Sequence, residues 1–372
     1  MAQRPPGDEH LDRRVAPGDG ARSLGPVRVM VAMSGGVDSS VAAARLAEQG
    51  HDVVGVTLRL WGGESDSGCC SVSDVDDARR VAASLGIDHH VFNFADDFAR
   101  HVVEPYVASH ASGRTPNPCI ECNRHLKFAA VLERASLLGF DAVATGHHAR
   151  VAPGPGGRRR IARGADVAKD QSYVLHVLGQ QELARTLLPL GTLTKPEVRR
   201  RAAALGLRTA TKPDSQDVCF ITRTSGRRAF LGERIELTPG RVVDVDGATL
   251  GEVAAVELVT VGQRRGLGLA GGSAPRYVLD VDLPTATVTV GEQGDLLVAQ
   301  QRVAELRWSD GVVGGALLAQ CSAHGAPRPV TVEEDGEGGA LLRWARPERR
   351  VAPGQSVVLY EGDEVVAGAR AC

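Results

Sequence analysis

The fold of this chain is decided by one stretch near its start, Val29-Met30-Val31-Ala32-Met33-Ser34-Gly35-Gly36-Val37-Asp38-Ser39-Ser40. Its apolar first half predicts a buried strand, and an alanine-rich helical pattern follows through Gln49. The first backbone N–H groups of such a helix have no intrahelical partner and lie at the positive end of the helix dipole. The Ser-Gly-Gly turn between strand and helix therefore predicts an anion site, because glycine lets a phosphate approach the backbone closely.

The loop belongs to neither of the two commonest nucleotide motifs. It lacks the Gly-Lys-Ser/Thr ending of Walker loops and the Gly-x-Gly-x-x-Gly of dinucleotide-binding folds. It resembles the pyrophosphate-binding loop of the PP-loop ATPases, which cleave ATP to AMP and pyrophosphate. That resemblance implies ATP and Mg²⁺ as cofactors, with Asp38 beside the magnesium pyrophosphate. The loop indicates the type of reaction, cleavage of ATP to AMP and pyrophosphate, but it does not identify the substrate.

Length and composition set outer bounds on the function. A chain of 372 residues predicts two or three domains. The formal net charge of −2 means that a nucleic-acid partner must be bound by local basic patches. No apolar stretch approaches the ~20 residues that span a bilayer, so we expect no membrane association and a cytoplasmic protein. Residues 1–26 are rich in Pro, Gly, Asp and Arg, which predicts a disordered extension and not a signal peptide.

The order of strand-like and helix-like runs predicts three folded parts. From Val27 to about Leu205 the two alternate, which predicts an α/β domain with a parallel, Rossmann-like sheet of the PP-loop type over residues 27–209. Valine-rich alternation with glycine turns then predicts short antiparallel strands. We assign residues 210–282 to a small linking domain and residues 283–372 to a C-terminal β-barrel.

A second turn after a strand lies at Gly146-His147, which follows the strand-like run Asp141 to Thr145. Ligands of parallel α/β sheets bind at the carboxyl ends of the strands. The turn at Gly146 and the loop at Ser34 are therefore expected to share one crevice.

Three of the seven cysteines lie in polar, turn-like settings. Cys119 and Cys122 stand just before a helical run, where the helix dipole favours a thiolate. Cys219 follows Lys212-Pro213-Asp214-Ser215-Gln216-Asp217-Val218. An odd number of cysteines argues against a secreted disulfide framework and for reactive or metal-binding thiols. Half a zinc site and coincidental thiols remain the alternatives, although no second Cys/His pair has conventional zinc spacing.

Five segments together give the chain a sharper resemblance, to the tRNA-specific 2-thiouridylases. They occur in that family's order and spacing from about residue 27 to 270, and the resemblance weakens in the last hundred residues. The segments are Ser-Gly-Gly-Val-Asp-Ser-Ser at 34–40, Thr-Pro-Asn-Pro-x-x-x-Cys-Asn at 115–123, Lys-Asp-Gln-Ser-Tyr at 169–173, Ser-Gln-Asp-Val-Cys-Phe-Ile at 215–221 and Thr-Val-Gly-Gln-Arg-Arg-Gly-Leu-Gly at 260–268.

The resemblance implies ATP-dependent sulfur transfer to the wobble uridine of tRNA. The uridine O2 is adenylated, Cys219 carries a persulfide, and Cys122 is the partner thiol that closes a disulfide with Cys219. The expected partners are tRNA and a cysteine desulfurase or sulfur-relay protein. The matching ATP positions are Ala32, Met33, Ser34, Gly35, Gly36, Val37, Asp38, Ser39, Leu58 and Gly146. The matching tRNA positions are Asn117, Pro118, Cys119, His147, Lys169, Asp170, Gln171 and Gln355.

Cys119 departs from the family pattern, because many members carry Asp there. With Cys119, Cys122 and Cys219 present, three thiolates are available for an iron–sulfur cluster, which is the alternative cofactor. Two alternative functions stay open. Another PP-loop adenylating ligase, such as an amide-forming synthetase, would not need Cys122 and Cys219. A non-enzymatic RNA-binding or redox-sensing protein would release no AMP.

Overall fold

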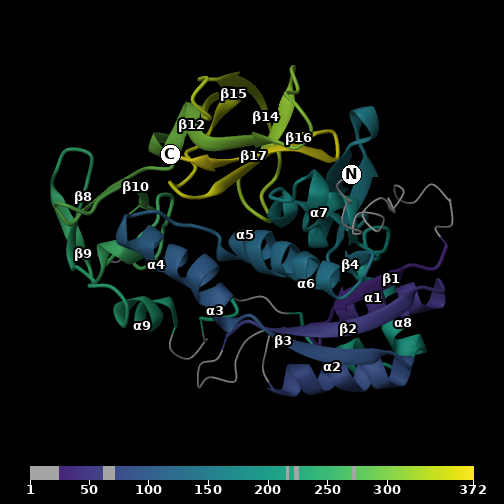
Figure 1. The fold of residues 1–372 in the computed structure, drawn as a ribbon. Coiled ribbons are helices and arrows are strands. Elements are labelled where there is room, and N and C mark those ends of the chain that lie inside the picture. The colour runs from purple at the N-terminus through teal and green to yellow at the C-terminus, as the bar shows by residue number, and fades with distance from the viewer. Residues whose placement is uncertain (1–24, 62–71, 215–217, 222–225, 270–273) are drawn as a thin grey trace, which may run out of the picture.

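A computed structural model describes residues 25–61, 72–214, 218–221, 226–269 and 274–372. The expected disordered extension lies outside the described residues except for its last two. The amino-terminal domain is built on a five-stranded parallel sheet (Figure 1). Its strands lie in the order β3 (Asp88–Asn93), β2 (Asp52–Arg59), β1 (Arg28–Ala32), β4 (Ala142–Ala144) and β7 (Thr186–Leu187).

Both faces of this sheet are covered by helices because successive side chains of a strand point to opposite faces. Val29 and Val31 of β1 pack in one apolar cluster with Val41 and Val198, whereas Met30 joins a second cluster. The first cluster lies beneath α1 (Val37–Glu48), α2 (Val72–Leu85) and α8 (Lys195–Ala204). The second involves α3 (Ala95–Phe98), a π-helical segment (Ala99–Val103), α4 (Glu104–Ala111), α5 (Pro118–Glu121), a second π-helical segment (Cys122–Ala130), α6 (Val131–Leu137) and α7 (Gln180–Ala184). The predicted α/β class is confirmed.

A small four-stranded sheet follows the α/β domain, after the short helix α9 (Gly226–Gly232). Its order is β10 (Tyr277–Asp282), β11 (Thr287–Gly291), β8 (Gly240–Val243) and β9 (Thr249–Val253). The pair β8–β11 is parallel, unlike the antiparallel pairing expected from the sequence, because a long connection separates these two strands. The domain boundary expected after residue 282 falls between β10 and β11, which are hydrogen-bonded neighbours.

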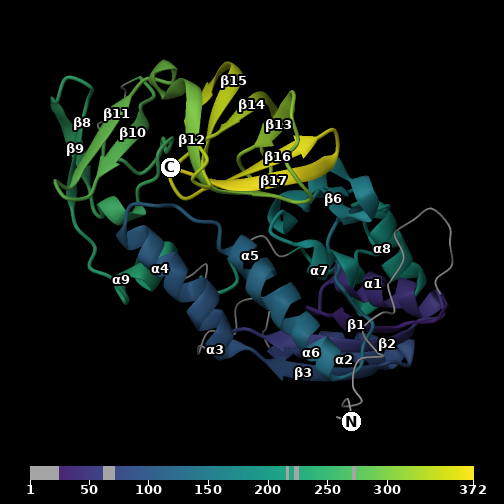
Figure 2. The ribbon, with the colours of Figure 1, turned by 45° about the horizontal axis from the view of Figure 1, so that its top comes forward.

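The last strands form a closed antiparallel barrel, which confirms the barrel expected from the sequence (Figure 2). Its order is β12 (Leu297–Trp308), β15 (Ala340–Arg349), β14 (Arg328–Glu334), β13 (Leu317–Gln320), β16 (Ser356–Glu361) and β17 (Glu364–Ala371). Pairing of β12 with β17 closes it. The hairpin of β5 (Ala149–Pro153) and β6 (Arg159–Arg163) leaves the α/β domain and joins the barrel sheet beside β17.

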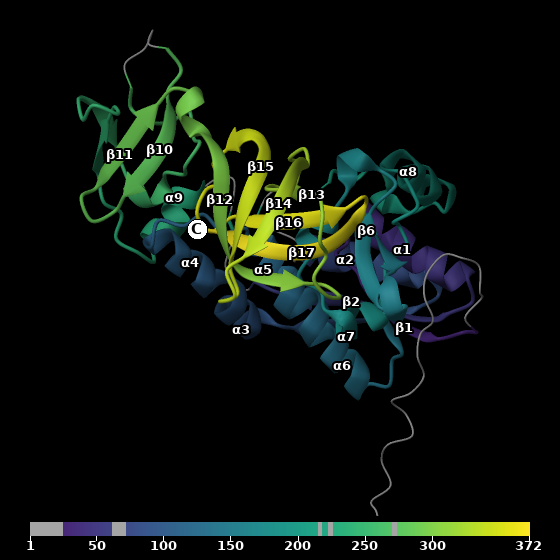
Figure 3. The ribbon, with the colours of Figure 1, turned by 90° about the horizontal axis from the view of Figure 1, so that it is seen from above.

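All three parts meet at residues 112–117, the segment that precedes α5. Figure 3 shows α5 beside the barrel strand β17. The backbone N–H of Thr115 donates to the carbonyl of Pro353 in the barrel at 2.8 Å. The Thr115 hydroxyl lies 3.1 Å from the hydroxyl of Thr260, in the chain between β9 and β10. The side-chain amide of Gln355 donates to the carbonyl of Thr115. This segment is therefore held from both other parts of the protein.

Candidate nucleotide and thiol site

The loop after β1 has the geometry of an anion cradle. Gly36 is the N-cap of the twelve-residue helix α1, and no side chain caps that helix end, so its first N–H groups remain open to a ligand. Gly35 adopts a φ of +70°, and a Cβ there would lie 2.2 Å from the carbonyl oxygen of Asp74. The Ser39 hydroxyl accepts a 3.2 Å hydrogen bond from the Ser34 N–H. Glycine is thus required at 35 by both conformation and space.

The turn at Gly146 packs directly on the first turn of α1. A Cβ on Gly146 would lie 2.6 Å from the backbone nitrogen of Ser39. The two loops thus lie against each other. They meet where the chain switches from the β1–β2–β3 side of the sheet to β4, the usual ligand position in open α/β sheets. Leu58 lies near the end of β2 and is buried.

Asp38, in the first turn of α1, is held by two basic side chains that sequence reasoning did not select. Lys195 Nζ lies 2.8 and 2.6 Å from its two carboxylate oxygens, and His148 Nε2 lies 3.1 Å from Oδ1. Burial by itself would raise the pKa of Asp38, but the hydrogen bonds from His148 and Lys195 outweigh burial, and the pKa is lowered. Asp38 is therefore a carboxylate at neutral pH, as a magnesium ligand must be.

The same lysine also holds Asp214, in the segment that leads to Cys219. Lys195 Nζ lies 2.9 Å from Asp214 Oδ1, and Asp214 further accepts from Lys169 at 2.8 Å and Arg199 at 2.7 Å. Burial would raise the pKa of Asp214, yet the hydrogen bonds from Lys169 and Lys195 lower it to about 2. Alternating charges thus link the loop at residues 34–38, which we call the phosphate loop, to the chain before Cys219: Asp38, Lys195 and Asp214.

Lys212 adds a second link between these two regions. Its ammonium group donates to the carbonyl of Gly35 at 3.0 Å, and to the carboxylates of Asp74 and Asp77 at 2.6 and 2.7 Å. Burial would lower the pKa of Lys212, but the two carboxylates raise it. The sequence signal at Lys195 was only Thr-Lys-Pro-Glu, which reads as a helix start with a capping box. Nothing in that pattern places its ammonium group against Asp38.

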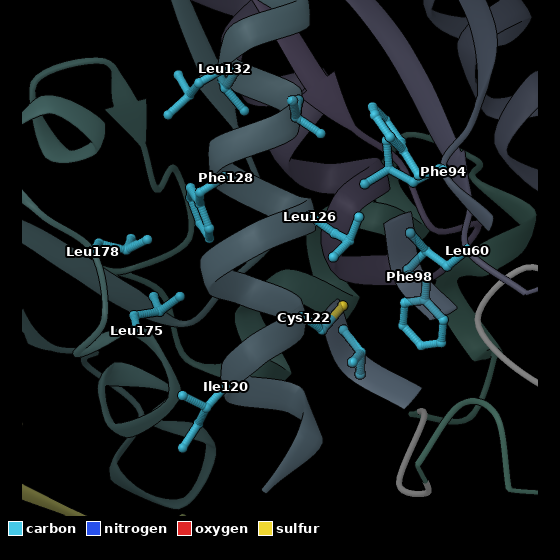
Figure 4. Packing of buried hydrophobic residues seen from close by; sticks show 14 of the residues in the cluster. Leu60, Phe94, Phe98, Ile120, Cys122, Leu126, Phe128, Leu132, Leu175 and Leu178 are labelled. Carbon is cyan, nitrogen blue, oxygen red and sulfur yellow. The ribbon is translucent and has the colours of Figure 1, made fainter. Parts of the chain in front are cut away.

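The first thiol segment is set by a well-formed helix start. The Asn117 side chain accepts a 3.1 Å hydrogen bond from the Cys119 N–H, and Pro118 occupies the first turn. Cys119 is exposed, whereas Cys122 is buried. Figure 4 shows Cys122 turned inward from its helix, on the side of Phe98 and Leu60. The two thiols therefore differ in solvent exposure although they lie on two consecutive helical segments.

The second thiol segment is anchored by an aromatic cluster, which we define as Trp61, Phe98, Tyr106, Phe220 and Phe230. Phe220 directly follows Cys219, and its ring centroid lies 5.6 Å from that of Phe98, 5.4 Å from Tyr106 and 5.1 Å from Phe230. Cys219 is half-buried against the same apolar core that contains Cys122. Phe98 belongs to the core cluster that contains Cys122, and its ring contacts that of Phe220, next to Cys219. The two thiol segments therefore pack on the same part of the core.

The side chains expected to contact tRNA have different settings. Lys169 is 40% exposed and paired with Asp214, and Gln355 contacts the Thr115 carbonyl. Gln171 accepts from the His148 N–H at 2.9 Å. Asp170 and His147 are buried: Asp170 accepts from Arg163 and the Ser172 hydroxyl, and His147 Nδ1 lies 2.7 Å from the Thr145 hydroxyl.

A cavity of about 190 Å³ opens beside Asn117 and Pro118. Its lining includes His101 and His125, whose rings stack at 4.7 Å, and Arg370 of the barrel. The cavity is therefore formed jointly by the α/β domain and the barrel.

Side chains that could bind a metal ion are not clustered in the described part of the chain. Within it, no cluster of three or more His, Cys, Asp or Glu side chains is arranged to hold a metal ion. Among the described helices, none combines the length and the apolar character needed to cross a membrane.

The parallel sheet, the uncapped Ser-Gly-Gly loop at its switch point and the appended barrel define a PP-loop α/β protein. Family models match in three consecutive pieces: "tRNA methyl transferase HUP domain" at residues 27–223, "tRNA methyl transferase PRC-barrel domain" at 228–292 and "Aminomethyltransferase beta-barrel domain" at 300–370. The chain belongs to the tRNA-specific 2-thiouridylase family, as its relatives demonstrate.

The relatives match over nearly their whole length. The tRNA-specific 2-thiouridylase MnmA of Chloroflexus aurantiacus is 47% identical over 91% of this chain and 97% of its own. That of Mycolicibacterium smegmatis is 49% identical over 92% and 99%. Among solved structures, a 4-thiouridine synthetase in complex with RNA and ATP matches with a TM-score of 0.37 and 18% identity, over 52% of this chain and 45% of its own.

Proposed function

We propose that this chain is an ATP-dependent tRNA-uridine 2-sulfurtransferase that replaces O2 of the wobble uridine with sulfur. The observation that carries the proposal is the link that Lys195 makes between Asp38 of the phosphate loop and Asp214, which precedes Cys219 in the chain. Cys122 and Cys219 belong to one apolar core. Membership of the 2-thiouridylase family supports the same substrate. The family-model descriptions mention methyl transfer, but a loop that cradles phosphate has no use in that reaction.

ATP binds, in this proposal, along Ala32 to Ser39, with Leu58 beside the adenine and Gly146 on the opposite wall. The open N–H groups of α1 and the Ser34 and Ser39 hydroxyls receive the phosphates. The Asp38 carboxylate would hold a magnesium ion, and that ion would neutralise charge on the pyrophosphate. Lys195 and Lys212 lie close enough to the loop to pair with the phosphates when nucleotide binds.

The tRNA lies across the α/β domain and the barrel. The wobble base cannot react while stacked, so it is flipped toward Asn117, Pro118 and Cys119. Lys169 and Gln355 supply accessible polar contacts. Asp170, which is buried, and Gln171, which is partly buried, act indirectly by fixing the backbone at Ser172 and His148. His147 is neutral, because burial lowers its pKa to about 3, and it supports the wall of the crevice without pairing with phosphate.

Sulfur transfer proceeds in three displacements. The uridine O2 attacks the α-phosphorus of ATP and releases pyrophosphate, which makes the oxygen a leaving group. The terminal sulfur of a Cys219 persulfide attacks C2, and AMP departs with that oxygen. The Cys122 thiolate then attacks the inner sulfur of Cys219, which frees the thiouridine and leaves a Cys122–Cys219 disulfide. An external dithiol must reduce that disulfide, and a cysteine desulfurase or sulfur-relay protein must reload Cys219.

Mass spectrometry of the wobble nucleoside tests the proposal. Unmodified tRNA is incubated with ATP, Mg²⁺, a persulfide donor and the wild type, or with Cys122→Ser, Cys219→Ser or Cys119→Ser. We expect one oxygen replaced by sulfur with the wild type, and no product with the first two variants. Cys372→Ser is the matched control, since that thiol is exposed and follows the last barrel strand.

The alternatives give different outcomes in the same assay. An amide-forming PP-loop ligase would form AMP on another acceptor and would tolerate Ser at both Cys122 and Cys219. A methyl transferase would add a methyl group without consuming ATP. A protein that only binds RNA would form neither AMP nor product. Any of these three results overturns the proposed sulfurtransferase.

A further inference from the structure

The segment from Lys212 to Asp214 connects the phosphate loop to Cys219. Lys212 donates to the carbonyl of Gly35, inside the loop itself. Asp214 accepts from Lys195, which at the same time holds Asp38 of the loop. Residues 212–214, which precede Cys219 in the chain, are therefore attached to the phosphate loop through two lysines, Lys195 and Lys212.

Lys195 is the central member of this link. Its side chain is 9% exposed, and its ammonium group lies 2.6 Å from Asp38 and 2.9 Å from Asp214. A buried ammonium requires counter-charges, and these two carboxylates provide them. Any ligand that recruits Lys195 or Asp38 must consequently alter the charge balance around Asp214.

Phe220 anchors the chain on the other side of Cys219. It is 3% exposed and seated among Phe98, Tyr106 and Phe230. Cys219 thus stands between an apolar anchor and an ionic anchor. Only the ionic anchor contains groups that a nucleotide can compete for, because phosphate oxygens bind lysine ammonium groups and Mg²⁺ binds carboxylates.

We propose that Lys195 is a positioning residue that couples nucleotide binding at the phosphate loop to the accessibility of the Cys219 thiol. Phosphates draw Lys195 from Asp214, Asp214 loses one of its cationic partners, and the Cys219 thiol reacts more readily. This inference rests on the proposed function, since it requires ATP to bind at the loop. By linkage, the state in which Cys219 is more accessible binds nucleotide more tightly by the same factor.

Because Asp214 and phosphate compete for Lys195, two variants should change the nucleotide affinity in different directions. Asp214→Asn removes the carboxylate that competes with phosphate for Lys195, so the full-length variant binds nucleotide as tightly as the wild type or more tightly. Lys195→Met removes the phosphate partner, so it binds nucleotide more weakly. A role limited to folding would weaken binding in both variants.

Alkylation of Cys219 by iodoacetamide, followed by peptide mass spectrometry, measures the coupling. The probe is the α,β-methylene analogue of ATP with Mg²⁺, and binding of the same probe is titrated in parallel. We expect the analogue to speed alkylation of Cys219 by about fivefold or more in the wild type, the range typical of coupled sites. In Asp214→Asn the rate is high from the start and responds less than about twofold to the analogue.

Two controls separate coupling from general effects. Alkylation of exposed Cys372 in the same sample must not respond to the analogue. Arg201→Gln, on the same helix as Lys195 but paired with Glu48, must respond as the wild type does. A wild type that binds no analogue overturns the proposed function and this inference with it. A wild type that binds it without a change at Cys219, or an Asp214→Asn variant that responds fully, overturns the inference alone.

Discussion

The guanidinium group of Arg160 donates two hydrogen bonds to the carboxylate of Asp310, at 2.8 and 3.0 Å. The side chains are only 4% and 2% exposed, so this ion pair is buried at the seam between the β5–β6 hairpin and the barrel. Glu361 and Glu364 accept further hydrogen bonds from Arg160 at 2.8 and 3.2 Å. The pair therefore fastens the barrel to the domain that carries the phosphate loop.

Arg160→Met is expected to lower the free energy of unfolding by about 3–5 kcal/mol, because Asp310 becomes a buried charge without its partner. Urea denaturation measures the change. The double variant Arg160→Met/Asp310→Leu removes both charges and should recover most of the loss. The matched control is Arg158→Met, at an exposed position of the same hairpin. Equal stability of the single and double variants would contradict a role for the pair.

Gly35→Ala is expected to destabilise the phosphate loop. A methyl group at this position meets the Asp74 carbonyl at 2.2 Å, and the φ of +70° disfavours any residue with a Cβ. Gly36→Ala is the control, since its φ is −93° and its nearest contact, the Ser34 hydroxyl, lies at 3.4 Å. We expect the first variant to unfold at a lower temperature, and the second to unfold as the wild type does. Equal unfolding temperatures would show that α2 does not confine Gly35.

Much of the α/β domain could be predicted because its signals are local. The continuous apolar run of β1 marked a buried strand, and the Ser-Gly-Gly loop marked the start of α1. The place of the crevice followed from the rule that parallel sheets bind ligands at the carboxyl ends of their strands. Gly146 and Ser39 could therefore be brought together before any coordinates were known.

The charged link from Asp38 to Asp214 could not be predicted, because its members are far apart in the chain. Lys195 reads locally as the first residue of a helix, and Asp214 as part of a turn. Their pairing depends on how α8 packs against α1, which no periodic pattern encodes. The same holds for the pairing of the β5–β6 hairpin with β17, which depends on how the hairpin packs against the barrel.

The stability of the protein is expected to fall as pH is lowered from about 7 to about 5, because several buried histidines must stay neutral. Burial lowers the pKa of His110 from 6.5 to about 4, and it has similar effects on His89 and His176. The unfolded chain takes up protons below 6.5, whereas the folded chain does so only near 4, so folding stability is complete above the first value and lost toward the second.

His110→Gln tests this pH dependence at one position. Its imidazole Nδ1 lies 3.1 Å from the carbonyl of Glu257, which a glutamine amide can replace without titrating. The variant should lose less stability than the wild type between about pH 7 and pH 5, by up to about 2 kcal/mol for one such group. Urea denaturation at both pH values provides the comparison. If the two proteins lose stability in parallel, His110 is not one of the groups responsible.

Phe220→Ala is expected to release the apolar anchor of the Cys219 segment. The side chain is 3% exposed, and removing it leaves a cavity among Phe98, Tyr106 and Phe230 that costs about 3–5 kcal/mol. Cys219 should then react faster with iodoacetamide and thiolation of tRNA should fall, whereas nucleotide binding persists because the phosphate loop is untouched. Phe220→Leu fills part of the cavity and should be intermediate in both readouts.

Phe92→Ala is the matched truncation, on the edge strand β3 and outside the aromatic cluster. Both alanine variants are assayed at a temperature where circular dichroism reports a folded protein. Faster alkylation in Phe220→Ala alone assigns the effect to the anchor, since a general loosening would also expose Cys219 in Phe92→Ala. Unchanged alkylation and thiolation in Phe220→Ala would mean that the segment keeps Cys219 in place without this ring, leaving Asp214 and Lys212 as its effective attachment.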